Sequence, residues 1–132
     1  MLPKSTRVKL PPCFINEAGY IQNIVEHEAG GVAVIRSKAG VWRSNHWHRT
    51  DWHYLYVLDG RMYYWERPVG SDEPPRRQEV GPGEMVFTGP MTEHATYFPV
   101  ATLVVSVSKL SRRHEDHEQD VVRLEQPLVT EP

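Results

Sequence analysis

The sequence predicts an all-β domain, built as an antiparallel barrel or sandwich, and three observations lead to this fold class. Short runs rich in Val, Ile, Tyr, Trp and Thr follow one another along the chain, with glycine or proline between most of them. No long segment has the 3.6-residue apolar period of an amphipathic helix. The 132 residues suit one domain, large enough to bury a core without disulfide bonds.

Seven segments are predicted to be strands because β-branched and aromatic residues dominate them. They are residues 20–27, 31–38, 52–58, 60–67, 83–89, 94–100 and 102–110. Residues 67–83 contain four prolines and three glycines, so we expect a long surface connection there.

The two ends of the chain differ from this strand-rich middle. Residues 1–13 carry three prolines and several basic residues, which favours an extended arm over a helix. The C-terminal end is heavily charged, so we expect a solvated segment; a short strand or latch around 121–124 is the alternative. The expected organisation is an N-terminal arm over 1–19, a barrel over 20–110 and a charged C-terminal segment over 111–132.

The bulk composition argues against several classes of protein. A formal net charge of -2 gives no electrostatic footprint for nucleic acid or an anionic membrane. The single cysteine, Cys13, can form neither an internal disulfide nor a thiolate metal site. No segment approaches the roughly 18–20 apolar residues that cross a bilayer, and no signal peptide is apparent, so we expect a cytoplasmic protein.

Three histidines lie within eight positions of the stretch NHWHRTDWHYLYVLDG. Because successive side chains of a strand alternate between its faces, His46 and His48 project to the same side. If the turn RTD folds the next strand back beside the first, His53 starts that strand at the depth of His48. His94 can approach the same point from an adjacent strand. Such pairs also arise by chance as structural residues, but neutral imidazole is the commonest side-chain ligand for Zn, Cu, Fe, Ni and Mn.

The spacing of glycine and histidine in this stretch resembles the first motif of the cupin superfamily, G-x5-H-x-H-x4-E-x6-G. Gly40, His46, His48 and Gly60 stand at the positions of the motif, and every spacing matches. One identity departs, since His53 stands where the family has glutamate.

The second cupin motif, G-x5-P-x-G-x2-H-x3-N, is matched in part. Gly83 opens it and His94 falls at its histidine, whereas Gly89, Met91 and Phe98 replace the proline, the second glycine and the asparagine. Together the motifs resemble those of small single-domain cupins, the cupin 2 type of conserved barrel. The resemblance implies an antiparallel double-stranded β-helix, or jelly-roll barrel, whose mouth holds one metal ion.

The resemblance carries the role of metal ligand directly to His46, His48 and His94, and to His53 by position only. Asp51 is a rival for the fourth place, although its position in a turn favours a residue that orients a histidine N–H. The implied cofactor is one divalent transition metal ion, Fe, Mn, Ni, Zn or Cu, because imidazole donors do not select among these metals.

Aromatic residues surround the histidines, and alternation predicts that about half of them face the interior of a barrel. Tyr64 and Tyr97 are the candidate catalytic residues, as proton donors near the metal. Tyr54 and Tyr56 are predicted to face away from the histidines. Together with Trp47 and the N-terminal arm they are expected to form a homodimer interface, since cupins usually dimerise.

Three functions are compatible with these features. The first, which we expect, is a metal-dependent enzyme, a dioxygenase or an isomerase or lyase, acting on a small anionic or enolisable substrate; four neutral ligands leave the full charge of the ion at the site. The second is a sugar-nucleotide epimerase or ketoisomerase, with Arg112, Arg113 and Arg123 available for a pyrophosphate. The third is a non-enzymatic cupin that binds or senses a small molecule.

Overall fold

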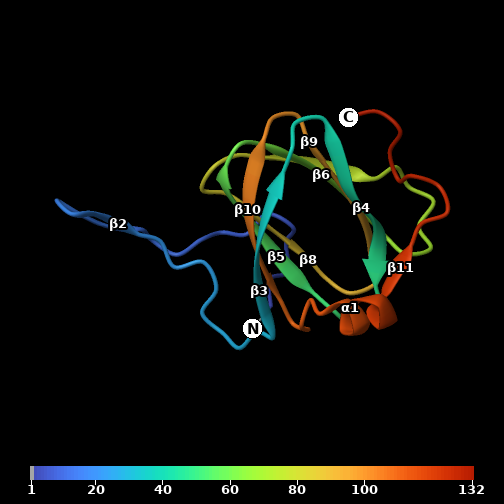
Figure 1. Ribbon diagram of the computed structural model, residues 1–132, viewed down its shortest axis with the longest axis horizontal. Helices are drawn as coiled ribbons and strands as arrows, with labels where there is room; N and C mark the ends of the chain where they lie inside the picture. Colours follow the sequence, from blue (N-terminus) through green and yellow to red (C-terminus); the bar gives the residue numbers. More distant parts are fainter. Residues whose placement is uncertain (1) are drawn as a thin grey trace.

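Two antiparallel sheets face each other across one apolar core in the computed structural model, which describes residues 2–132 (Figure 1). The four-stranded sheet has the order β3 (Gly31–Ser37), β10 (Thr102–Ser108), β5 (His53–Asp59) and β8 (Met85–Thr88). The five-stranded sheet has the order β11 (Val121–Arg123), β4 (Val41–His48), β9 (Thr92–Phe98), β6 (Met62–Pro68) and β7 (Arg76–Val80). A separate hairpin consists of β1 (Phe14–Asn16) and β2 (Gly19–Ile21), and a short helix, α1 (His114–Asp120), precedes β11. The predicted all-β antiparallel fold class is confirmed.

The core between the sheets is built from alternate residues of strands on both sides. Leu55 and Val57 project into it from β5 of one sheet, and Met62, Tyr64 and Phe98 project into it from β6 and β9 of the other. Each of these side chains is buried. The predicted inward face of β5, which begins with His53, therefore lies against this core.

The N-terminal arm covers the outer face of the four-stranded sheet. Tyr54 and Tyr56 are only 4% and 7% exposed, in a second apolar cluster against which Val8 and Leu10 pack. The backbone N–H of Val8 donates to the carbonyl of Met85 in β8 over 3.0 Å, which holds the arm along the sheet edge. These tyrosines face away from the histidines as predicted, but they are buried within the chain and do not form the outward surface that the sequence suggested.

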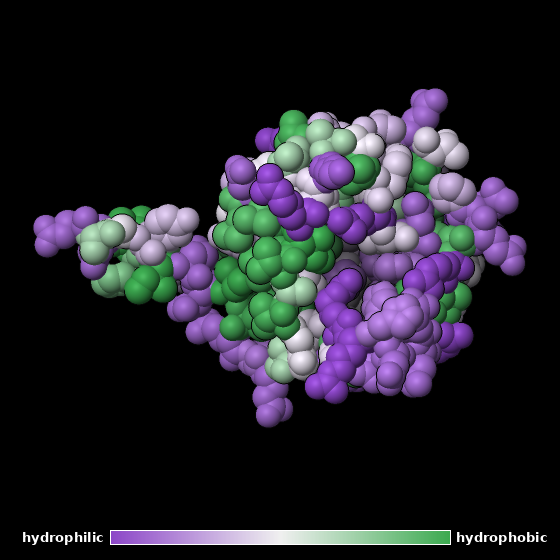
Figure 2. Space-filling view, viewed as in Figure 1, coloured by the Kyte–Doolittle hydropathy of each residue, from purple (hydrophilic) through white to green (hydrophobic). Residues whose placement is uncertain are grey.

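The β1–β2 hairpin projects from the barrel and exposes large apolar side chains (Figures 1 and 2). They are Phe14 (59% exposed), Ile15 (75%), Tyr20 (70%) and Ile21 (61%). The hairpin spans the boundary expected at residue 19 between the arm and the barrel. On β3, an edge strand of its sheet, Val32 and Val34 are also exposed, at 71% and 69%.

Three segments differ from the structure predicted for them. The strand expected over 20–27 ends at Ile21. The connection expected over 67–83 contains β7, which pairs with β6. The C-terminal segment 111–132 forms α1 and β11, and β11 pairs with β4 as the alternative of a short strand or latch expected, while most residues of the segment are exposed. The seven-residue α1 is too short to span a membrane, and no other helix among the described residues could do so.

Two turn positions explain the spacing of the glycine and histidine motifs. Gly60, between β5 and β6, has a φ of 99°, and a Cβ there would lie 2.4 Å from Oγ1 of Thr102, so only glycine fits. Met91 has a φ of 58° at the position where the cupin motif has glycine. The N–H of Met91 donates to the carbonyl of His48 over 2.8 Å, which ties the turn before β9 to the end of β4.

Candidate metal centre and pocket

β4 carries His46 and His48 on its inner face, where their ring centroids are 4.8 Å apart. The register of β4 against β9 shifts between Ser44 and His46, so Asn45 is an extra, bulged residue. Ser44 and Asn45 have positive φ values of 69° and 57°. The bulge changes the alternation of the strand, and Arg43 before it faces the interior together with the two histidines after it.

His94 lies directly beside His46, because the two residues are register partners of β9 and β4, and their ring centroids are 4.7 Å apart. Nδ1 of His94 lies 2.9 Å from the backbone carbonyl of Thr92, so this nitrogen carries the proton and donates to that carbonyl. The lone pair is left on Nε2, which is buried and has no hydrogen-bond partner among residues 2–132. Leaving a buried nitrogen unpaired costs about 1–3 kcal/mol, which a ligand at this position would offset.

His53 approaches the other histidines from the opposite sheet. Its ring centroid is 5.1 Å from that of His94 and 5.7 Å from that of His48. The sequence suggested that the turn RTD folds β5 back beside β4. In the structure this turn instead carries the chain from the five-stranded sheet to the four-stranded one. Both ring nitrogens of His53 are buried without a partner in the described part of the chain. The predicted convergence therefore occurs across the barrel and not along one sheet.

Ligand nitrogens of His46, His48 and His94 all lie within 4.8 Å of one another. Two nitrogens bound to one ion at about 2.1 Å are at most about 4.2 Å apart, so a small contraction would bring all three onto one ion. His53 is not part of this closest group, although its ring borders it. Three imidazoles whose nitrogens lie close together, with a fourth ring beside them, fit a divalent transition metal.

Burial keeps these histidines neutral, which is the form that binds a metal. Burial, reinforced by neighbouring imidazoles, lowers the pKa of His46 to about 2. Burial also lowers the pKa of His94 to about 4, against the opposing effect of its bond to the Thr92 carbonyl. The pKa values of His48 and His53 are lowered for the same principal reason. At neutral pH the cluster presents lone pairs and not N–H cations.

Two buried carboxylates, those of Asp51 and Asp120, lie close to His48. Nδ1 of His48 lies 3.3 Å from Oδ2 of Asp120, the last residue of α1. Asp120 also accepts the backbone N–H groups of Thr50 (2.9 Å) and Asp51 (3.0 Å). Asp51 in turn accepts the N–H of Leu110 over 3.0 Å. Ligand atoms of Asp51, Asp120 and His48 lie within 4.8 Å of one another, in a second group that shares His48 with the three histidines, so Asp51 stays both a candidate ligand and a candidate supporting residue.

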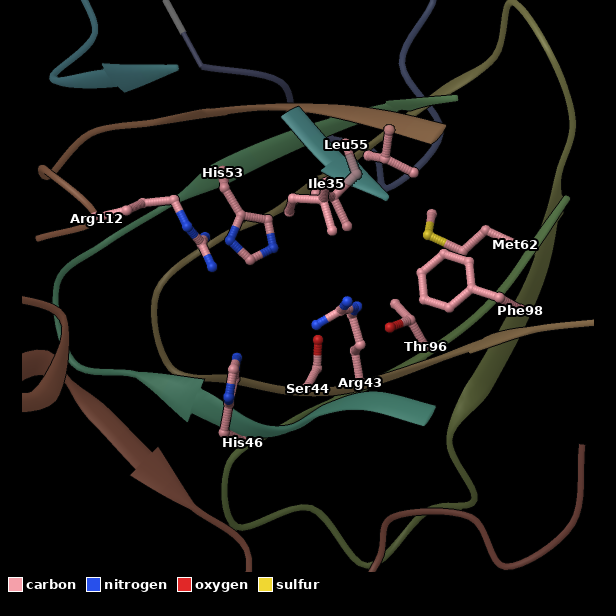
Figure 3. A pocket seen from close by; sticks show the side chains of 11 residues that line it. Ile35, Arg43, Ser44, His46, His53, Leu55, Met62, Thr96, Phe98 and Arg112 are labelled. Carbon is pink, nitrogen blue, oxygen red and sulfur yellow. The ribbon is translucent and has the colours of Figure 1, made fainter. Parts of the chain in front are cut away.

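The C-terminal segment contributes side chains beside the histidines, and of these the sequence suggested only Arg112, for a pyrophosphate. The ring of His117 in α1 has its centroid 5.5 Å from that of His48 and 6.1 Å from that of His46. Asp120 contacts His48, and Arg112 lines the pocket next to His53 (Figure 3). In the sequence these residues are distinguished only by being polar or charged, and such residues are equally typical of a solvated segment.

A pocket of about 240 Å³ lies between the two sheets beside the histidines (Figure 3). His46, His53 and Arg112 lie at one end, and Met62 and Phe98 lie at the other. The full lining consists of Ile35, Arg43, Ser44, His46, His53, Leu55, Met62, Thr96, Phe98, Val104 and Arg112. The cavity therefore has a cationic, imidazole-rich end and an apolar end.

Neither of the two predicted catalytic tyrosines lines this pocket. Tyr64 lies inside the barrel, where its hydroxyl is 2.5 Å from Oγ1 of Thr88 and burial raises its pKa. Tyr97 lies on the opposite face of β9 from His94, and its ring packs against Trp42 at a centroid distance of 5.0 Å. The polar groups that do face the cavity are the histidines, two arginines, Ser44 and Thr96.

Neither a family model nor a curated protein sequence matches this chain. Several solved structures resemble it. The 3,4-ketoisomerase QdtA from Thermoanaerobacterium thermosaccharolyticum matches 94% of this chain and 90% of its own, with a TM-score of 0.75 and 18% identity. The dTDP-4-dehydrorhamnose 3,5-epimerase from Sulfolobus tokodaii matches 93% of this chain and 78% of its own, with a TM-score of 0.75 and 15% identity.

A dTDP sugar isomerase from Desulfovibrio desulfuricans G20 is also similar, over 98% of this chain and 90% of its own, with a TM-score of 0.75 and 11% identity. These likenesses, together with the two facing sheets, show that the chain has a cupin-type jelly-roll fold. At such low identities they show the fold alone, and the function must be argued from the site.

Proposed function

We propose that the chain is a metal-binding cupin of the cupin 2 type and an enzyme that acts on a small anionic or enolisable substrate at its histidine centre. One observation carries this proposal: Nε2 of His48, Nε2 of His94 and both ring nitrogens of His53 are buried in neighbouring rings without hydrogen-bond partners in residues 2–132. Native structures leave few buried polar atoms unpaired, so such a cluster indicates a missing ligand. One divalent ion bound by several imidazoles would satisfy the cluster at once.

The residues of this chain divide the work of such a centre. His46, His48 and His94 would hold the ion, with His53 as the fourth ligand from the facing sheet. The Thr92 carbonyl orients His94. When bound, the ion supplies Lewis acidity that stabilises a carboxylate or enolate oxygen. Because protein ligands occupy at most four positions, two remain for substrate in a six-coordinate ion, which suits a dioxygenase or an isomerase or lyase.

A sugar-nucleotide epimerase or ketoisomerase is the second candidate. It is favoured by the similarity to QdtA and to two further proteins named for dTDP sugars, and by the guanidinium of Arg112 at the pocket. Against it, no tyrosine lines the pocket. Arg123 is held outside by Glu118 at 2.7 and 2.8 Å. The cavity of about 240 Å³ is also smaller than the range of about 300–1,000 Å³ usual for drug-sized ligands.

Metal reconstitution separates these functions. The natively purified protein should contain a transition metal by elemental analysis. After loading with Fe, Mn, Ni, Cu or Zn it should turn over members of a panel of dicarbonyls, enediols and small carboxylates. Turnover of a dTDP sugar by metal-free protein would support the second candidate instead. Bound metal and tight ligand binding without turnover would indicate a sensing module.

We also propose that two copies of the chain associate through the β1–β2 hairpin. Four exposed apolar side chains on the hairpin, and two more on β3, are costly in water and suit burial against a second copy. Size-exclusion chromatography with light scattering should give the mass of a dimer. Ile15→Lys combined with Ile21→Lys should give the mass of one chain, whereas Leu58→Lys, an exposed apolar residue outside the hairpin, should leave the dimer intact.

A further inference from the structure

Two guanidinium groups face the same small cavity without a carboxylate partner. Arg43 enters it from β4 and Arg112 enters it from the coil before α1 (Figure 3). Neither forms an ion pair within the described residues 2–132. Arg43 is held in place by bonds from Nε to Oγ of Ser37 (2.8 Å) and from Nη2 to the carbonyl of Arg36 (3.2 Å). The guanidinium of Arg112 has no hydrogen-bond partner in this part of the chain.

The local backbone directs both arginines toward the cavity. The bulge at Ser44 and Asn45 turns Arg43 inward, where a regular strand would leave it on the outer face opposite His46. Arg112 lies in the coil between β10 and α1, and β11, which follows α1, pairs with β4. The bulge in β4 and the C-terminal segment therefore bring two like charges to one pocket.

Both arginines are exposed residues that also line the cavity. Their like charges repel each other, and an anion bound between them would relieve that repulsion. Asp51 attracts Arg112 electrostatically, but among the described residues no carboxylate lies within ion-pair distance of either guanidinium. A guanidinium presents parallel N–H donors in a planar fork that matches the two oxygens of a carboxylate. The other end of the cavity is apolar, formed by Leu55, Met62, Phe98 and their neighbours. A purely inorganic anion would leave that end unfilled.

We propose that Arg43 and Arg112 form a carboxylate-binding subsite, and that the substrate is a small monocarboxylate with an apolar body. This inference rests on the proposed function, because it names the substrate class of the same site. The carboxylate binds between the two guanidinium groups, and the apolar body packs on Met62 and Phe98. The carboxylate then lies beside His46 and His53, at the end of the cavity where the proposed ion binds.

Calorimetric titration with benzoate and with its neutral analogue benzamide tests this subsite in metal-free and metal-loaded protein. Benzoate should bind at least tenfold more tightly than benzamide in both forms. Arg112→Gln and Arg43→Gln should each weaken benzoate binding by roughly 10- to 100-fold and leave benzamide binding unchanged. Arg113→Gln, which changes the exposed neighbouring arginine outside the pocket, is the matched control and should change neither.

Each other outcome overturns one specific proposal. Equal binding of benzoate and benzamide, or equal losses in Arg112→Gln and Arg113→Gln, would overturn the carboxylate subsite. Tight binding of TDP with no binding of benzoate would replace it with a diphosphate site. A chain that retains benzoate selectivity but binds no transition metal would overturn the metal centre and leave the subsite standing. Unchanged benzamide binding in the variants shows that the pocket is still folded.

Discussion

Replacing His46 or His94 with alanine is expected to lower the affinity of the protein for a divalent transition metal by roughly 60- to 700-fold. Apparent binding free energies of about 10–16 kcal/mol for four-ligand zinc sites correspond to about 2.5–4 kcal/mol for each ligand, and each 1.4 kcal/mol is a factor of ten. His94 should show the full effect, because its tautomer is fixed by Thr92 and its Nε2 is fully buried. Competition with a chromophoric chelator measures the affinity.

The control for this prediction is His114→Ala, which removes an exposed histidine of α1 and should leave metal affinity unchanged. His53→Ala addresses the replacement of the cupin glutamate by histidine. If His53 is the fourth ligand, its variant should lose affinity by a similar factor. Unchanged affinity in His53→Ala alone would contradict the four-histidine centre, and unchanged affinity in all of the ligand variants would contradict the metal centre itself.

The parts of the site that could be predicted from the sequence are those fixed by local geometry. His46 and His48 share a face because strand side chains alternate, and two turns that need positive φ, at Gly60 and Met91, set the distance to the next strands. His94 was placed by the motif resemblance, and the structure makes it the direct register partner of His46.

The remaining parts depend on interactions that leave no local pattern. The inward orientation of Arg43 follows from a bulge at Ser44 and Asn45, and neither residue is a glycine that would mark a positive φ. The C-terminal segment is mostly charged, so its composition indicates solvation. The segment is instead tied to the barrel by Asp120, which accepts backbone N–H groups of the turn between β4 and β5. A contact between a carboxylate and a turn far away in the chain produces no periodic pattern in the sequence, so it could not be predicted.

Asp120→Ala is expected to weaken metal binding by roughly 10- to 100-fold and to destabilise the metal-free protein by about 3–5 kcal/mol. The first effect follows because Asp120 holds Nδ1 of His48 at 3.3 Å, and a carboxylate behind a ligating histidine fixes its ring and raises its basicity. The second follows because the buried N–H of Asp51 and the part-buried N–H of Thr50 lose a charged acceptor. Chelator competition and denaturant unfolding measure the two effects separately.

Asp120→Asn distinguishes a positioning role from a purely structural one. Its amide oxygen can still accept from Thr50, but its NH₂ group would meet the N–H of His48 and Asp51, so the imidazole loses its acceptor while part of the turn survives. The visible absorption of the cobalt(II)-loaded protein should therefore change in Asp120→Asn, and should not change in the exposed helix control Asp116→Asn. A variant that melts earlier but keeps the wild-type metal affinity and cobalt spectrum would mean that Asp120 supports only the fold. Because Asp120 lies in the last turn of α1, a changed spectrum would show that the C-terminal segment helps to position the ligands of the histidine centre.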